Sequence, residues 1–205
     1  GPRLMKRTTT KPEAAPKPVT NLPATPPQPA SAYFMEERHD RTERHTLSVL
    51  VDNEPGVLAR VIGLFSGRGY NIESLTVSET EHAKHQSLIT VVTTGTPMVI
   101  EQIKNQLDRL VPIHRVIDMT LSGNSIEREL AMVKVRGKGE QRVEALRLAD
   151  AFRARVIDAT TESFVFEITG ASGKIEQFVA LMLPLGLVEV ARTGIAAIRR
   201  GPEGL

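Results

Sequence analysis

The sequence predicts an α+β protein built from two βαββαβ units with antiparallel sheets. Three observations support this. Apolar residues recur with a period of two and then of about 3.6 residues, and this alternation runs through the same order twice. Glycine, proline or short polar runs stand at most of the changes of period. The 205 residues, of which 40% are apolar, suffice for two small cores.

The first unit is predicted to open with a strand at residues 46–51, where β-branched residues and alternation coincide. A turn, Asp52 to Gly56, then leads into a helix, since proline suits a first helical turn. Gly67 and Gly69 suit the end of this helix. Its apolar residues fall on one face: Val57, Leu58, Val61, Ile62 and Phe65.

The rest of this unit continues the alternation. Strands are predicted at residues 71–80, 87–94 and 113–121, the first two joined by a polar turn. Pro97 opens a second helix, with four inward residues: Ile100, Ile103, Leu107 and Leu110.

The second unit repeats this order after a short linker at residues 122–125. Strands are predicted at 129–136, 155–160, 163–169 and 187–198, and helices at 140–153 and from Ser172 toward Leu183. The inward residues of the first of these helices are predicted to be Val143, Leu146, Ala149 and Phe152. Two ferredoxin-like domains follow, at residues 45–121 and 128–200.

The N-terminal 43 residues read as a disordered tail, because eight of the 13 prolines lie in the first 29 residues and large apolar residues are few. The tail also holds the basic excess. Residues 1–45 carry 8 Lys/Arg against 5 Asp/Glu, so the remainder is slightly acidic although the whole chain is +2. Nucleic-acid binding by the folded part is therefore disfavoured.

Several other classes are also disfavoured. No run of about 18 apolar residues exists, and the start lacks the apolar core of a signal peptide. The absence of cysteine removes thiolate catalysis and is consistent with a cytoplasmic protein. His82 and His85 share a polar turn without a carboxylate cluster, so we expect no metal there. No catalytic set is visible, and a non-enzymatic role is expected.

The turn at residues 52–56 is the best candidate binding site. A helix N-terminus presents unpaired N–H groups and partial positive charge, which favour a carboxylate. Gly56 would allow a ligand to approach the backbone, since glycine has no Cβ. Asn71 carries an amide that can donate to a carboxylate and accept from an ammonium. The pattern predicts a receptor for something small and anionic, such as an amino acid.

The stretch DNEPGVLARVIGLFSGRGYNIESLTV resembles the opening of the small, regulatory subunit of acetohydroxyacid synthase, also called acetolactate synthase. The resemblance continues through ITVVTTG, EQIKNQLDRLVPIHRVIDM, SIERELAMVKV, FRARVIDAT and GLVEVARTGIAAIRRG, so it covers roughly residues 45 to 201. It implies that the first unit is an ACT domain, a ligand-binding module that pairs side by side in a homodimer. By motif match the effector residues are Asn53, Gly56, Val57, Leu58, Asn71 and Ile72.

The resemblance also implies a partner and a role. The chain would activate a large catalytic subunit and confer feedback inhibition by a branched-chain amino acid, with valine favoured. Thiamine diphosphate, Mg²⁺ and FAD would be bound by that partner, and no cofactor by this chain. At Ser87-Leu88-Ile89-Thr90 the family more often has arginine where this chain has Leu88, which puts any role of that basic residue in doubt. The alternative is a stand-alone ACT-type transcription regulator that responds to amino acids.

Overall fold

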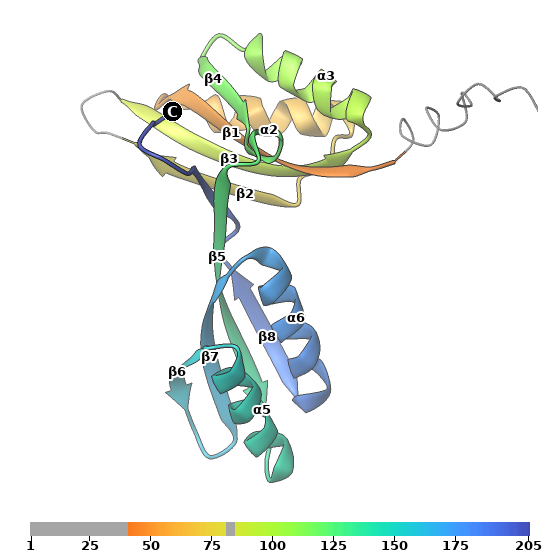
Figure 1. Cartoon of the computed structure of the whole chain (residues 1–205), viewed down its shortest axis with the longest axis vertical. Helices are drawn as coiled ribbons and strands as arrows, with labels where there is room; N and C mark the ends of the chain where they lie inside the picture. The colour runs from red at the N-terminus through yellow and green to blue at the C-terminus, as the bar shows by residue number, and fades with distance from the viewer. Residues whose placement is uncertain (1–40, 81–84) are drawn as a thin grey trace, which may run out of the picture.

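The computed structural model describes residues 41–80 and 85–205, which form two antiparallel sheets, each with helices on one face (Figure 1). Most of the predicted tail, residues 1–40, lies outside the described residues, as does His82. The first strand begins at Glu43, two residues before the predicted start of the domain, because Glu43 is already paired with Gly95.

The first sheet has the strand order β2-β3-β1-β4, so β2 and β4 are its edges. Its elements are β1 (Glu43–Asp52), α2 (Val57–Arg68), β2 (Ser74–Glu79), β3 (Gln86–Gly95), α3 (Pro97–Asp108) and β4 (Ile113–Asp118). Helices α2 and α3 cover the same face of this sheet (Figure 1).

The first core lies between that face and the two helices. Alternate residues of β1 meet the apolar stripes of α2 and α3 there, as the periodicity predicts. Its buried members include Leu47, Val49, Val61, Phe65, Ile89, Ile103 and Leu107. Two residues of the predicted stripe of α2 depart from it: Leu58 is 39% exposed, and Ile62 is half-buried and lies outside this core.

A short helix, α4 (Met119–Ser122), connects the first unit to the second. The second sheet has the order β6-β7-β5-β8, the same topology as the first, and β9 pairs with the opening residues of β5. Its elements are β5 (Ser125–Arg136), α5 (Glu140–Ala151), β6 (Arg155–Ala159), β7 (Ser163–Gly170), α6 (Ser172–Met182), the 3₁₀ turn η2 (Leu183–Leu185), β8 (Leu187–Arg192) and β9 (Ala196–Arg199). The predicted architecture of two ferredoxin-like α+β units is thus confirmed.

Two details of the second unit differ from the prediction. Helix α5 turns Ala145 and Ala149 inward and leaves Val143 57% and Leu146 38% exposed. Phe164, Phe166 and Phe178 are in the same buried cluster, so alanine is the size that fits on the helix above them.

The last predicted strand is also wrong as a single element. It is divided at Thr193–Ile195, where Gly194 has φ +88°, a left-handed conformation that breaks the extended run. After this break the chain leaves β8 and runs beneath the first sheet (Figure 1). Among the described residues, no helix is long and apolar enough to cross a membrane.

Candidate effector site

The turn between β1 and α2 has the geometry of an open helix N-terminus. Gly56 is the N-cap residue, with φ +87°, and no side chain of the described region caps the first turn. A Cβ at this position would have no described neighbour within 4 Å, so the space above the turn is open. The backbone N–H groups that begin α2 therefore face a region that a carboxylate is able to enter.

Asn53 fixes the other side of this turn. Its backbone N–H donates to the carbonyl of His85 at 2.7 Å, and its Nδ2 donates to Oε1 of Glu79 at 2.8 Å. Glu79 is the last residue of β2. The turn is thus attached to the C-terminal end of the edge strand.

Asn71 lies in the loop that follows α2. We expected it at the start of a strand, but β2 begins only at Ser74. Its Nδ2 donates to Oγ1 of Thr94 at 2.9 Å, and its backbone carbonyl accepts from the hydroxyl of the buried Thr93. These bonds fix the position of the loop, and the Asn71 side chain remains at the surface.

Within one chain these two groups of residues lie at opposite ends of α2. Gly56 caps its N-terminus, and Asn71 comes two residues after Gly69, which caps its C-terminus. Twelve helical residues span about 18 Å, so a single amino acid is too small to touch both ends. The structure therefore does not bring all the predicted site residues together in one copy of the chain.

The three apolar candidates occupy different environments. Val57 is buried in the first core, Leu58 is exposed beside the turn, and Ile72 packs against the edge of the core beside Asn71. Leu58 is therefore at the Gly56 end of α2 and Ile72 at the Asn71 end.

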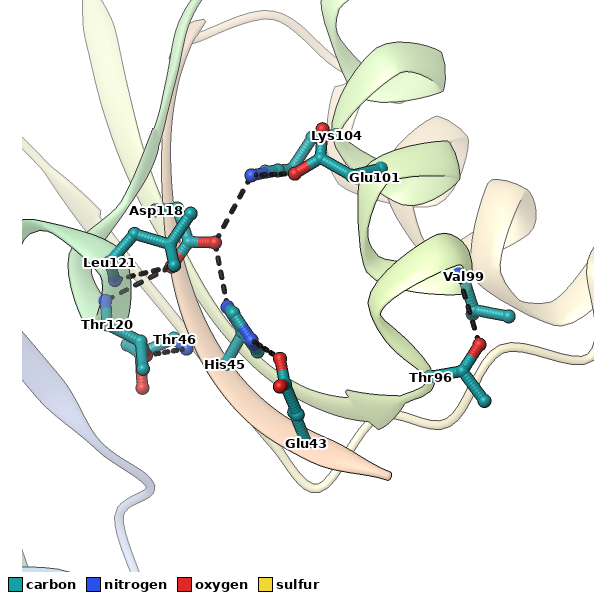
Figure 2. A network of polar contacts seen from close by, with 10 residues as sticks. All are labelled: Glu43, His45, Thr46, Thr96, Val99, Glu101, Lys104, Asp118, Thr120 and Leu121. Carbon is teal, nitrogen blue, oxygen red and sulfur yellow. Dashed lines mark hydrogen bonds and ion pairs between the residues drawn. The ribbon is translucent and has the colours of Figure 1, made fainter. Parts of the chain in front are cut away.

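A buried charged cluster, which our sequence reasoning missed, joins four elements of the first unit (Figure 2). His45 of β1 contacts Asp118 of β4 at 2.7 Å and Glu43 at 2.9 Å. The second oxygen of Asp118 accepts from the backbone N–H groups of Thr120 and Leu121, which begin α4. The cluster thus anchors the connector to the second unit.

Lys104 brings α3 into the same cluster. Its Nζ lies 3.4 Å from Asp118 and 2.6 Å from Glu101. Burial alone would lower the pKa of Lys104, but the hydrogen bond to Glu101 and the charges of both carboxylates outweigh it and raise the pKa above its ordinary value. The one signal we identify in the sequence is His45, because it lies on β1 two residues before the buried Leu47 and on the same face.

A polar cleft of about 450 Å³ lies between the two units. Arg44 of β1 reaches across it, with Glu73 at 3.0 Å, Glu127 at 3.9 Å and the hydroxyl of Ser172 at 3.5 Å. Glu73 is two residues from Asn71, so the Asn71 end of the candidate site adjoins this cleft.

A second ion pair lines the same cleft from the other unit. Glu129 is 5% exposed and accepts two bonds of 2.8 Å from the guanidinium of Arg192. The hydrogen bond to Glu129 raises the pKa of Arg192 above its ordinary value, against the opposing effect of burial. Within the described ranges, no group of three His, Cys, Asp or Glu side chains is arranged to hold a metal ion.

Two family models match the chain, one over each unit. Residues 47–115 match the ACT domain of the acetohydroxyacid synthase small subunit type, and residues 128–201 match the small subunit of acetolactate synthase. Together they include most of the described elements and leave out the N-terminal 46 residues.

Curated proteins and a solved structure agree with these models. The chain is 46% identical to a probable acetolactate synthase small subunit of Archaeoglobus fulgidus over 77% of this chain and 98% of that protein. It is 44% identical to the small subunit of acetolactate synthase isozyme 3 of Escherichia coli, over 78% of this chain and 98% of the relative. The crystal structure of an acetolactate synthase small subunit from Thermotoga maritima superposes with a TM-score of 0.69, at 40% identity over 78% of this chain and 99% of that one. The chain therefore belongs to the family of acetolactate synthase small subunits, as the sequence predicted.

Proposed function

We propose that this chain activates the catalytic subunit of acetolactate synthase and makes it sensitive to feedback inhibition by a branched-chain amino acid, with valine as the first candidate. The thiamine diphosphate, Mg²⁺ and FAD of the reaction would be held by that partner. Family membership supports the subunit role and disfavours the alternative of a transcription regulator. The observation that carries the effector proposal is the position of the edge strand β2 between the two halves of the candidate site.

We first consider how two copies of the chain would pair. The outer edge of β2 has a row of backbone groups that no other described strand pairs, and such an edge is a template for a strand of another chain. If two copies pair β2 with β2 in antiparallel fashion, the start of one strand meets the end of the other. Asn71 precedes the start, and Asn53 is bonded to Glu79 at the end. Two-fold pairing therefore brings Asn71 of one copy toward Asn53 and Gly56 of its partner.

The residues brought together by this pairing would suit the chemical groups of an amino acid. The open turn at Gly56 suits a carboxylate, because no described side chain caps the first turn of α2, although the N–H of Val57 already donates to the carbonyl of Glu54 at 3.4 Å. The amide of Asn71 suits either charged group of an amino acid. Leu58 from one copy and Ile72 from the other would bound a small apolar space for a branched side chain. A homodimer would thus contain two equivalent sites, each shared between the copies.

Binding at such a site would also have to change the activity of the catalytic subunit. Valine inhibits only if it binds the inhibiting arrangement of the subunits more tightly than the activating one. A site that joins two copies meets this condition when the pairing at β2 differs between the two arrangements. We also propose that the protein acts in the cytoplasm.

Reconstitution with the catalytic subunit tests the proposal. The parent should raise acetolactate formation several-fold and should make it valine-sensitive. Gly56→Asp and Gly56→Ala both place a side chain at φ +87°, a conformation that aspartate adopts at least as readily as alanine, but only aspartate adds a negative charge where the ligand carboxylate would lie. Gly56→Asp should therefore lose valine inhibition to a much greater degree than Gly56→Ala, and equal effects would contradict the site.

A substitution at Asn71 can be compared with a matched control substitution in the same unit. Loss of one hydrogen bond to a charged group costs about 1.5–3 kcal/mol, so Asn71→Ala should weaken valine binding roughly ten- to a hundred-fold. Asn105→Ala removes an exposed amide from α3 and should leave binding unchanged. Calorimetry on both variants, with circular dichroism to confirm folding, gives the comparison. No activation by the parent at a saturating subunit ratio would refute the subunit role itself.

A further inference from the structure

The segment between β8 and β9 docks on the edge strand of the first sheet. The backbone N–H of Ile195 donates to Oγ of Ser74 at 2.9 Å, and the hydroxyl of Thr76 donates to the carbonyl of Ile195 at 3.1 Å. Ile195 is 3% exposed and belongs to neither main core, so it is buried outside both of them, beside the cleft between the units. Two hydrogen bonds thus join Ile195 to Ser74 and Thr76 of β2, which lie 121 and 119 positions earlier in the sequence.

Gly194 makes this close approach possible. Its φ of +88° lies in the left-handed region, and a Cβ would come within 2.9 Å of both Ser74 Oγ and Thr76 Cγ2. A side chain at position 194 therefore requires that the side chains of Ser74 and Thr76, or the segment itself, shift. The backbone of the second unit thus lies directly on the side chains of β2.

The contact lies on the face of β2 that points away from the first core. Ser74 and Thr76 alternate with Leu75, which packs on the first core, so they face the other side of the sheet and leave the outer edge of β2 free. The contacted segment follows β8 directly, where Arg192 holds the buried Glu129 of β5. A shift of β2 would therefore move the segment that joins β8 to β9.

We propose that Ser74, Thr76, Gly194 and Ile195 form a clasp that transmits changes at the β2 edge to the second sheet. The regulatory half of this proposal rests on the proposed function, because it makes the clasp the route from the valine site to the second unit. The cleft beside the clasp, between Arg44 and Arg192, gives the units room to move. Arg44 holds the near side of the cleft through Glu73, which directly precedes β2.

Hydrogen exchange on the full-length protein, without any ligand, tests whether the clasp couples β2 to β8. In the double variant Ser74→Ala, Thr76→Val the amide of Ile195 loses its acceptor and should exchange about tenfold faster than in the parent. Amides of β8 should also exchange faster, since the clasp no longer ties them to β2. Ser78→Ala is the control, because Ser78 lies on the same face of β2, two residues beyond Thr76, and makes no hydrogen bond with the described residues of the segment. If exchange in β8 is unchanged while that of Ile195 rises, the clasp transmits nothing and the proposal is overturned.

Two glycine substitutions distinguish the effect of a contact with β2 from the effect of backbone strain. Gly194→Ala and Gly201→Ala both place alanine at a φ near +90°, but only the Cβ at position 194 meets described neighbours within 4 Å. Gly194→Ala should therefore perturb exchange in β2 and β8, whereas Gly201→Ala should perturb neither. Equal effects of the two substitutions would contradict a role of the clasp.

The regulatory half is tested with the catalytic subunit present. The double variant should bind valine with the affinity of the parent and activate the enzyme, yet lose most of the inhibition. Retention of full inhibition by a variant whose clasp is open, as judged by hydrogen exchange, would overturn this half. If the parent itself does not respond to valine, the proposed function fails instead, and the exchange experiment still decides whether the clasp couples the two sheets.

Discussion

His45 Nδ1 and Asp118 Oδ2 lie 2.7 Å apart, and each of these side chains is only 6% exposed. The same carboxylate caps α4, the connector between the two units. Asp118→Ala should therefore lower the free energy of unfolding by about 3 kcal/mol, since it leaves His45 and Lys104 without their buried partner and removes a helix cap. Asp108→Ala, at an exposed aspartate of α3, should change it by less than about 0.5 kcal/mol. Urea denaturation of the two variants gives the comparison, and equal values would show that the cluster is not structural.

The raised pKa of Lys104 predicts a pH dependence in the alkaline range. Because its folded-state pKa lies above the unfolded value near 10.4, its contribution to stability is complete below about pH 10 and is lost as pH rises through the folded pKa. The stability difference between the parent and Lys104→Met should accordingly be larger at pH 8 than at pH 11. A difference that stays constant or grows with pH would contradict this assignment. Comparison of the two proteins at each pH cancels the titration of their other groups.

The buried pair Glu129–Arg192 should matter far more than an exposed one on the same sheet. Glu129→Ala leaves the Arg192 guanidinium, which is 35% exposed, without its partner, and the loss of such charged hydrogen bonds costs about 1.5–3 kcal/mol. Glu189→Ala breaks the exposed bond to Lys134 and should cost less than about 1 kcal/mol. Thermal unfolding of both variants tests the difference, and similar melting temperatures would show that the Glu129 pair is dispensable.

The N-terminal tail should be dispensable for folding of the described units. Every residue of the two buried cores lies after residue 46, so deletion of residues 1–40 removes no core side chain. The free energy of unfolding should shift by no more than about 0.5 kcal/mol. A large drop in melting temperature would show that part of the tail packs on the folded chain.

The order and type of the main elements follow from local patterns, which is why the sequence predicts them. The α2 stripe, with Val61 and Phe65, and the glycine stop at Gly69 depend only on residues a few positions apart. The division of the last strand does not. Its reason is the contact of Gly194 with Ser74 and Thr76, which lie 120 and 118 positions earlier in the sequence, so no local pattern predicts it.

The candidate site shows the same limit. The turn at Gly56 could be identified because its chemistry is local. The separation of Asn71 from Gly56 also follows from the predicted limits of the helix between them. Which neighbour each end of that helix faces could not be predicted, since contacts such as Asn53 Nδ2 with Glu79 join residues far apart in the sequence. Val143 and Leu146 were misplaced for a related reason: apolarity predicts a buried position, but the phenylalanines of β7 and α6 leave room only for Ala145 and Ala149.

The central claim, a valine site shared between two copies, is tested most directly by mixed dimers. One copy carries Gly56→Asp and the other carries Asn71→Ala, with different affinity tags so that only heterodimers are recovered. If each site takes Gly56 from one copy and Asn71 from the other, the heterodimer keeps one intact site, formed by the glycine of the second copy and the asparagine of the first.

Titration calorimetry on these heterodimers gives the answer. The shared-site account predicts one valine bound per heterodimer with the parent's affinity, while neither variant homodimer binds at that affinity. If the heterodimer binds no valine at the parent's affinity while the parent binds two, each site is contained within one chain, and the account is contradicted.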